Sequence, residues 1–194
     1  MTEPMHLQRL FIGIKFSSEI IDALAATSAA MQAQAADLGA DISWVSRDNF
    51  HLTLKFIGTK ATADAAIAAL NPVALASPVF EVQVKSCLVF PNESRPAMLW
   101  ARVFDENEAL SSLARAVESA LAGVGVPAEP YPFTPHVTLG RVKSGRVAGE
   151  LLFPYKMRDF GSMRVSSFDL FLSEQIDGCP KYTSLYSFQM TGTA

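Results

Sequence analysis

Several short runs of the chain are continuously apolar or alternate apolar and polar positions, and between those runs apolar positions recur every three or four residues. The short runs are rich in β-branched and aromatic residues, which predicts β-strands. These runs are residues 9–16, 42–45, 50–58, 79–90, 97–103, 163–174 and 182–190. A further strand is expected at "HVTLGR", which follows a proline-rich segment. Strands are therefore expected along the whole chain.

The stretches with helical spacing predict three helices. Their expected ranges are 17–39, 62–71 and 105–123. Ser17 or Ser18 can cap the first helix, and Gly39 can end it. Asp105 and Glu108 fit a capping box for the third helix, with aspartate in the place of the usual serine or threonine. Each half of the chain thus runs from a strand through a long helix to another strand, which favours an α+β fold with two similar lobes.

A strand in each half carries a histidine and a threonine two residues apart. His51 and Thr53 lie in one such strand, and His136 and Thr138 lie in the other. Because residues i and i+2 of a strand point to the same side, each pair shares one face. The chain has 3 histidines, and two of them occupy the pattern His-x-Thr-Leu. Two similar lobes that face each other would bring all four side chains into one cleft.

A pair of histidines across a cleft suits displacement at phosphorus. A neutral histidine can take a proton from the attacking oxygen, while a protonated histidine gives one to the leaving oxygen. Histidine suits both roles because its ordinary pKa lies near neutrality. The threonine hydroxyls can donate to non-bridging phosphate oxygens, and the strands would hold all four groups in position.

Composition sets limits on this picture. The chain has 194 residues, of which 49% are hydrophobic and 18% charged, so we expect a single two-lobed domain over residues 1–194 with a substantial core. A formal net charge of −3 gives no support for a protein that coats nucleic acid. Cys87 and Cys179 form no zinc-binding pattern, and no apolar run approaches membrane-spanning length. We therefore expect a reduced, soluble, cytoplasmic protein.

Five segments together resemble the RNA 2′,3′-cyclic phosphodiesterase (2′-5′ RNA ligase, LigT-like) family of the two-histidine phosphoesterase superfamily. They are "RLFIGIKF", "WVSRDNFHLTLKFIG", "FPNESRPAMLWARV", "PYPFTPHVTLGRV" and "LFLSEQIDGCPKYTSLYSF". The resemblance implies a bilobal α+β fold with antiparallel sheets, pseudo-twofold symmetry and both motifs in a central cleft. It also implies hydrolysis of a terminal 2′,3′-cyclic phosphate to a 2′-phosphomonoester without a metal or other cofactor. The reverse direction is 2′-5′ RNA ligation.

The resemblance also implies a role for each motif residue. His51 corresponds to the general acid that protonates the leaving 3′ oxygen, and His136 corresponds to the base that activates water. Thr53 and Thr138 correspond to phosphate-binding threonines, and Arg141 corresponds to an arginine that contacts phosphate. The expected partners are RNA ends bearing a 2′,3′-cyclic phosphate, such as those of tRNA fragments. We expect a monomer that associates with no membrane.

Strand geometry by itself leaves the cationic phosphate ligand open. Arg141 is five residues after His136, an odd spacing that turns it to the opposite face of a regular strand. It can reach the phosphate only if the strand twists, bulges or ends by Gly140. By this parity Lys55 is the better placed cation, whereas the family resemblance favours Arg141.

Other interpretations of the same residues stay open. Each histidine taken singly is more often structural than catalytic. The aromatic residues that can stack on a base, but more often form a core, are Phe11, Trp44, Phe56, Tyr131 and Phe133. A metal site would need carboxylates beside the histidines, and only Asp48 is close in sequence, so we expect none.

Two alternative functions compete with RNA end hydrolysis. One is a phosphodiesterase for a small cyclic nucleotide or a 2′-5′ oligoadenylate, which the net negative charge favours slightly. The other is a catalytically silent RNA-binding module that keeps the cleft. The two intact His-x-Thr motifs argue against the silent module, because binding alone needs no pair of proton-transfer groups.

Overall fold

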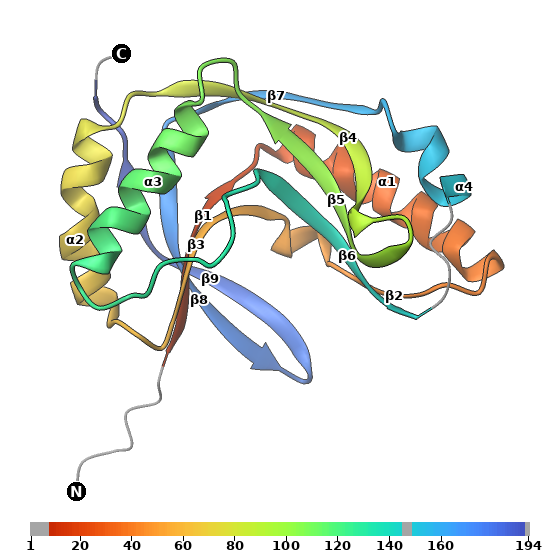
Figure 1. Ribbon diagram of the computed structural model, residues 1–194, viewed down its shortest axis with the longest axis horizontal. Coiled ribbons are helices and arrows are strands. Elements are labelled where there is room, and N and C mark those ends of the chain that lie inside the picture. The colour runs from red at the N-terminus through yellow and green to blue at the C-terminus, as the bar shows by residue number, and fades with distance from the viewer. Residues whose placement is uncertain (1–7, 145–148, 193–194) are drawn as a thin grey trace, which may run out of the picture.

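The computed structural model describes residues 8–144 and 149–192, which form an α+β fold (Figure 1). In chain order the elements are β1 (Arg9–Lys15), α1 (Ser18–Asp37), β2 (Asp41–Trp44), η1 (Arg47–Asn49), β3 (His51–Gly58), α2 (Ala63–Ala76), β4 (Phe80–Asn92), β5 (Arg95–Phe104), α3 (Ala109–Ala122), β6 (His136–Ser144), α4 (Gly149–Leu152), η2 (Phe153–Tyr155), β7 (Asp159–Val165), β8 (Ser167–Ile176) and β9 (Cys179–Gln189). Within the described ranges the strands form one 9-stranded sheet in the order β7-β4-β5-β6-β3-β1-β8-β9, with β2 paired to β6.

The sheet divides into two lobes. Strands β3, β1, β8 and β9 form the first lobe, and strands β7, β4, β5, β6 and β2 form the second. All of these strands pair antiparallel with their neighbours. Between the lobes β3 and β6 are in register only at Leu52 and Val137. The two strands that carry the His-x-Thr motifs are therefore neighbours at the junction of the lobes.

Each lobe is covered by helices from both halves of the chain. Helix α1, from the first half, contacts β2 and β7 of the second lobe, while α3, from the second half, contacts β3 of the first lobe. Helix α2 packs on α3, β8 and β9. Figure 1 shows α2 and α3 together beside one lobe, and α1 with α4 beside the other. The repeated order of elements in the sequence predicts two lobes but not this arrangement of the helices.

The first two helices begin where the sequence predicts. The hydroxyl of Ser17 accepts a hydrogen bond from the Ile20 N–H, and Gly39, with a φ of 67°, follows the last turn of α1. The predicted range 62–71 is too short, because α2 continues through Pro72 to its last residue. Its buried residues recur every four positions on both sides of that proline, so packing on the core maintains the helix.

Two other predictions are wrong in part. Asp105 does cap α3, since its Oδ2 accepts from the Leu110 N–H at 2.9 Å, but Glu108 makes no capping bond and has a left-handed φ of 53°. The run 163–174 is two strands, β7 and β8, with a break at Ser166. The chain passes there from the second lobe to the first, because β7 pairs with β4 whereas β8 pairs with β1.

One continuous core joins both lobes and their helices. In the motif strands, Leu52 and Leu54 of β3 and Val137 and Leu139 of β6 are buried, while the histidines and threonines between them are partly exposed. A one-residue slip would exchange these two sets. Burial of the aliphatic residues therefore determines which way the polar residues point. In the ranges described, no helix is both long and apolar enough to cross a membrane.

Candidate active site

The two His-x-Thr motifs face the same side of the sheet where the lobes meet. Strands β3 and β6 run antiparallel and are in register at the central residue of each motif. Continuing this register by one residue in each direction sets His51 opposite Thr138, and Thr53 opposite His136. Residues directly opposite on one face are close neighbours in a sheet. The structure thus brings together the four motif residues that the sequence singles out.

Both histidines are held by the same backbone interaction. The Nδ1 of His51 lies 2.6 Å from the carbonyl oxygen of Asn49, and the Nδ1 of His136 lies 2.7 Å from that of Thr134. Because a carbonyl oxygen only accepts, Nδ1 carries a proton in both rings. In neutral His51, Nε2 therefore accepts from the hydroxyl of Thr53, at 3.0 Å. The Nε2 of His136 has no hydrogen-bond partner among the described residues.

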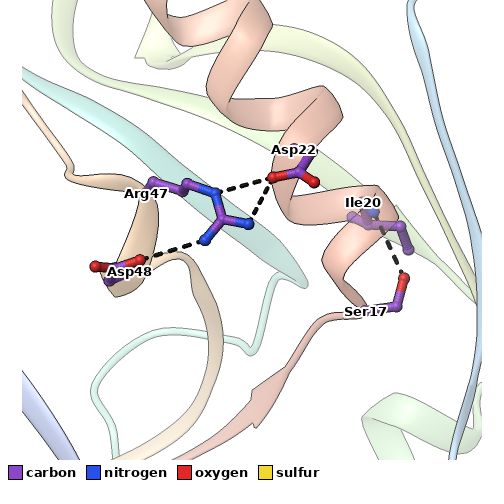
Figure 2. A network of polar contacts seen from close by, with 5 residues as sticks. All are labelled: Ser17, Ile20, Asp22, Arg47 and Asp48. Atoms are coloured by element: carbon purple, nitrogen blue, oxygen red, sulfur yellow. Dashed lines mark hydrogen bonds and ion pairs between the residues drawn. The ribbon is translucent and has the colours of Figure 1, made fainter.

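The turn η1 positions the carbonyl that holds the first histidine. The side-chain amide of Asn49 donates to the carbonyl oxygen of Pro180 at 2.7 Å, which ties the turn to β9. On the other side Arg47 donates from Nε to Oδ1 of Asp22 at 2.9 Å, which ties it to α1 (Figure 2). Asp48 faces Arg47 at 3.3 Å and is exposed. In the part of the chain described, no group of three or more His, Cys, Asp or Glu side chains is placed to hold a metal ion.

Burial lowers the pKa of both histidines below the ordinary value of 6.5. For His51 the loss of water is the largest cause, the bond to Asn49 opposes it, and the charges of His136 and Arg141 lower the pKa further. For His136 burial outweighs the bond to Thr134. The charges of His136 and Arg141 thus act on His51, whereas no charge is among the causes for His136. Neutral imidazoles are therefore favoured when no anion is bound.

Equivalent bulges follow the two motifs. The register of β3 with β1 skips Leu54, and the register of β6 with β5 skips Leu139. One unpaired residue shifts the alternation of faces, so Arg141 lies on the same face as the second motif. The odd spacing between His136 and Arg141 therefore does not exclude Arg141 as a phosphate ligand. At the equivalent place after the first motif lies Phe56, which is 61% exposed.

The same bulge turns Lys55 away from the cleft, so the prediction from parity is wrong for this residue. Its side chain is buried, and Nζ donates to the carbonyl oxygen of Pro127 at 2.7 Å and to Oε1 of Glu118 at 3.3 Å. Oε1 of Glu129 lies 3.5 Å from the same nitrogen. Glu118 belongs to α3, and the other two residues belong to the segment before β6. Lys55 therefore ties the strand of the first motif to the segment that leads to the second.

The aromatic residues considered from the sequence have different environments. Phe11 is buried, and Trp44 and Phe133 are partly buried against the core. In contrast, Phe56 and Tyr131 are exposed, so a core role is wrong for these two. Phe56 also faces the cleft, since it pairs with Phe11 across β3 and β1. It is the one of the five that lies both exposed and beside the motifs.

Each histidine also packs against aromatic rings. Trp100 of β5 stacks on His136 with ring centroids 3.7 Å apart and planes 16° from parallel. The indole Nε1 is buried and makes no hydrogen bond with any residue described. His51 instead meets Phe11 at 4.8 Å with a tilt of 39°, and Tyr182 at 5.1 Å nearly edge-on. A flat stack on indole stabilises a protonated ring, so the second histidine has the stronger support for positive charge.

A cation stands opposite each histidine on the next strand outward, and the sequence reasoning singled out neither. Lys15 of β1 is paired with His51, and Arg102 of β5 is paired with His136. Lys15 forms an ion pair with Asp169 of β8. The alternation of β5 shows that Arg102 is on the exposed face, but only the strand pairing shows which residue it meets.

A family profile and individual known sequences are similar to this chain. The profile of the 2′-5′ RNA ligase superfamily matches residues 21–175. An Aquifex aeolicus (strain VF5) protein named RNA 2′,3′-cyclic phosphodiesterase is 32% identical over 193 residues, which is 97% of this chain and 100% of that protein. An Aeropyrum pernix protein of the same name is 31% identical over 154 residues, which is 78% of this chain and 88% of that protein.

Solved structures are similar over both lobes. A protein of Thermus thermophilus superposes with a TM-score of 0.80 at 25% identity, covering 96% of this chain and 100% of its own. The structure of E. coli LigT complexed with 3′-AMP has a TM-score of 0.74 at 26% identity, covering 95% of this chain and 98% of its own. The likeness therefore includes the strands that carry both motifs.

Proposed function

This chain belongs to the 2′-5′ RNA ligase superfamily, and we propose that it hydrolyses the 2′,3′-cyclic phosphate at an RNA end to a 2′-phosphomonoester. It is an enzyme that acts on phosphodiester bonds. The supporting observation is that two histidines, each with Nδ1 committed to a carbonyl, lie on one face of the sheet. Nε2 of His136 has no partner among the described residues, and Nε2 of His51 accepts only from the Thr53 hydroxyl. The name of the Aquifex aeolicus relative and the 3′-AMP complex of LigT support a ribonucleotide end as substrate.

His136 is the base in this proposal. Burial lowers its pKa, so the ring is neutral before substrate binds, and its Nε2 has no partner among the residues described. That lone pair can take a proton from water while the water oxygen forms its bond to phosphorus. The stacked Trp100 favours the imidazolium that results.

His51 is the acid, and it must therefore carry a proton on Nε2. In the free protein burial, His136 and Arg141 all lower its pKa and oppose this state. A bound phosphate anion offsets them, because a negative charge nearby favours the protonated ring. The proton then passes to the 3′ oxygen as its bond to phosphorus breaks, which leaves the phosphate on the 2′ oxygen.

Thr53, Thr138 and Arg141 bind the phosphate in this proposal. The Thr53 hydroxyl, which donates to Nε2 of His51 in the free protein, turns to a non-bridging oxygen once that nitrogen is protonated. Arg141 adds a positive charge on the same face. With a 5′-hydroxyl in place of water, the same groups would form a 2′-5′ bond. We further propose that the protein is a single two-lobed domain that works as a cytoplasmic monomer on RNA ends such as those of tRNA fragments.

The test compares three substrates with one protein sample in EDTA. A short RNA with a 2′,3′-cyclic end should give a 2′-phosphate, seen by ³¹P NMR, and a sample lacking both histidines should give none. Preferred turnover of 2′,3′-cyclic AMP or of 2′-5′ oligoadenylate would support the small-molecule alternative. Binding of RNA without turnover would support the silent module. Activity that needs added divalent ions would contradict the mechanism.

A further inference from the structure

The two cations that stand opposite the histidines have different partners. Lys15 is paired with Asp169, a buried carboxylate that also accepts from the Ser184 hydroxyl at 3.0 Å. Arg102 is exposed, and no carboxylate in residues 8–144 or 149–192 forms an ion pair with it. The first lobe therefore neutralises its cation, whereas the second lobe leaves its cation available to an anion.

A second unpaired cation lies beside this arginine. Lys85 of β4 is directly opposite Arg102 in the antiparallel pair of β4 and β5. The guanidinium carbon of Arg102 is 4.4 Å from the ring centroid of Phe104, and Nζ of Lys85 is 4.9 Å from the same centroid. Like charges directly opposite each other destabilise a sheet. Neither cation forms an ion pair within the described chain, although Asp159 of β7 stands opposite Lys85 on its other side. The ring of Phe104 reduces the repulsion between the two cations.

These two cations continue the face that carries the reacting groups. Arg102 is the cross-strand neighbour of His136, and Lys85 lies one strand further out. Phe104 is two residues beyond Arg102 along β5, about 7 Å away at the rise of a strand. Beyond Phe104 lies a groove of about 1160 Å³ between β4 and the helices α2 and α3. Arg102 and Lys85 therefore lie between the second histidine and this groove, which Lys85 and Phe104 themselves line.

We propose that Arg102 and Lys85 bind the phosphodiester next to the cyclic end, so that the RNA chain leaves the active site over Phe104. The inference rests on the proposed function and adds a subsite for a second phosphate. Glu81, Asp105 and Glu106 also line the groove, and they disfavour further phosphates there. The groove then receives the sugar and base of the adjoining nucleotide against the apolar side chains of α2 and α3.

The test uses a substrate with one phosphate and a substrate with several. Arg102→Gln and Lys85→Gln should each lower kcat/KM for a short RNA with a cyclic end by about tenfold, as for loss of a hydrogen bond to a charged group. The same variants should change kcat/KM for 2′,3′-cyclic AMP by less than about twofold, since that molecule has only the reacting phosphate. Each variant should also reduce the salt slope of RNA binding by about 1.

Matched variants complete the design. Lys60→Gln removes an exposed charge in the turn after β3 and should behave as wild type on both substrates. Arg102→Lys should recover part of the loss on RNA. An equal loss on both substrates would place Arg102 at the reacting phosphate and overturn the subsite, as would an unchanged rate on RNA. If the wild-type protein hydrolysed neither substrate, the proposed function would fail. Binding of a labelled 3′-phosphorylated RNA by the variants would then still decide the subsite.

Discussion

The two lobes present the same motif in different surroundings. In the first lobe Gly13 lies opposite Thr53, and in the second lobe Trp100 lies opposite Thr138. A Cβ atom at Gly13 would sit 2.8 Å from the carbonyl oxygen of Leu52, so the close approach of β1 to β3 admits no side chain there. At the equivalent place in the second lobe stands Trp100, which has the largest side chain of any residue type and stacks on His136.

The charges differ between the lobes as well. After the motif the first lobe presents Phe56, and the second presents Arg141. The lysine opposite the first histidine is neutralised, while the arginine opposite the second is not. The first lobe thus offers aromatic surface and the second offers positive charge. In the proposed mechanism the duplicated motif supplies the proton transfers, and the unequal surroundings would distinguish the base of the substrate from its phosphates.

Removal of either histidine should have the largest effect and tests whether the lobes divide the proton transfers. His51→Ala and His136→Ala should each lower kcat/KM on a cyclic end by about 10²-fold or more. With a leaving group that needs little protonation, His51→Ala should recover part of the rate and His136→Ala should not. Initial rates on the two substrates, with circular dichroism as the folding control, measure this. Recovery of the His136 variant alone would mean that the acid and base belong to the opposite lobes.

The next largest effect concerns Lys55, which occupies the place that Gly140 has in the second lobe. Lys55→Met should lower the free energy of unfolding by about 1–3 kcal/mol, because the carbonyl of Pro127 loses its donor. The exposed control Lys60→Met should stay within about 0.5 kcal/mol of wild type. Urea denaturation compares them. Equal stability of the two variants would show that the contacts of Lys55 with α3 and with the segment before β6 contribute nothing.

The threonines test the symmetry of phosphate binding. Thr53→Val and Thr138→Val keep the shape of the side chain and should each lower kcat by about tenfold, because a donor to a charged oxygen is lost. The measurement is kcat on saturating cyclic-ended RNA. A loss confined to Thr53→Val would indicate that its hydroxyl only positions His51, to which it donates in the free protein. The symmetric role of the two motifs would then be wrong.

The smallest effect concerns the pKa values of the histidines in the free protein. Both should lie below 6.5, and Arg141→Gln should raise the pKa of His51, because the arginine charge lowers it. The pKa of His136 should move much less, since burial is what lowers it. NMR titration of the imidazole resonances measures both values. An equal shift of both histidines would contradict the expectation that the charge of Arg141 acts on His51 more than on His136.

The same directions predict how stability depends on pH. Above pH 6.5 both histidines are neutral in the folded and the unfolded chain, and their contribution to stability is complete. As the pH falls below 6.5 the unfolded chain binds protons first, because its pKa values are higher, so stability decreases down to the folded pKa values. Urea midpoints at pH 7.5 and pH 5.5 test this. His136→Gln should show a smaller difference between them than the wild-type protein.

Local patterns in the sequence were enough to predict the α+β class and the face that carries the motifs. The alternation around His51 and His136 leaves aliphatic residues for the core, so the histidines and threonines must face the other way. The ends of α1 followed from Ser17 and Gly39, because capping depends on a few adjacent residues. These features depend on neighbours in the chain, and the sequence alone therefore determined them.

Only the tertiary structure decided what depends on pairing between distant segments. The choice between Arg141 and Lys55 depended on one unpaired residue in each motif strand, and a bulge arises from the register of the neighbouring strand rather than from a local pattern. Arg102 and Trp100 reach the second histidine because β5 pairs with β6. The positions of α1 on the second lobe and α3 on the first likewise depend on contacts between distant segments. Burial of each helix needs a partner face, and the sequence does not state which lobe supplies it.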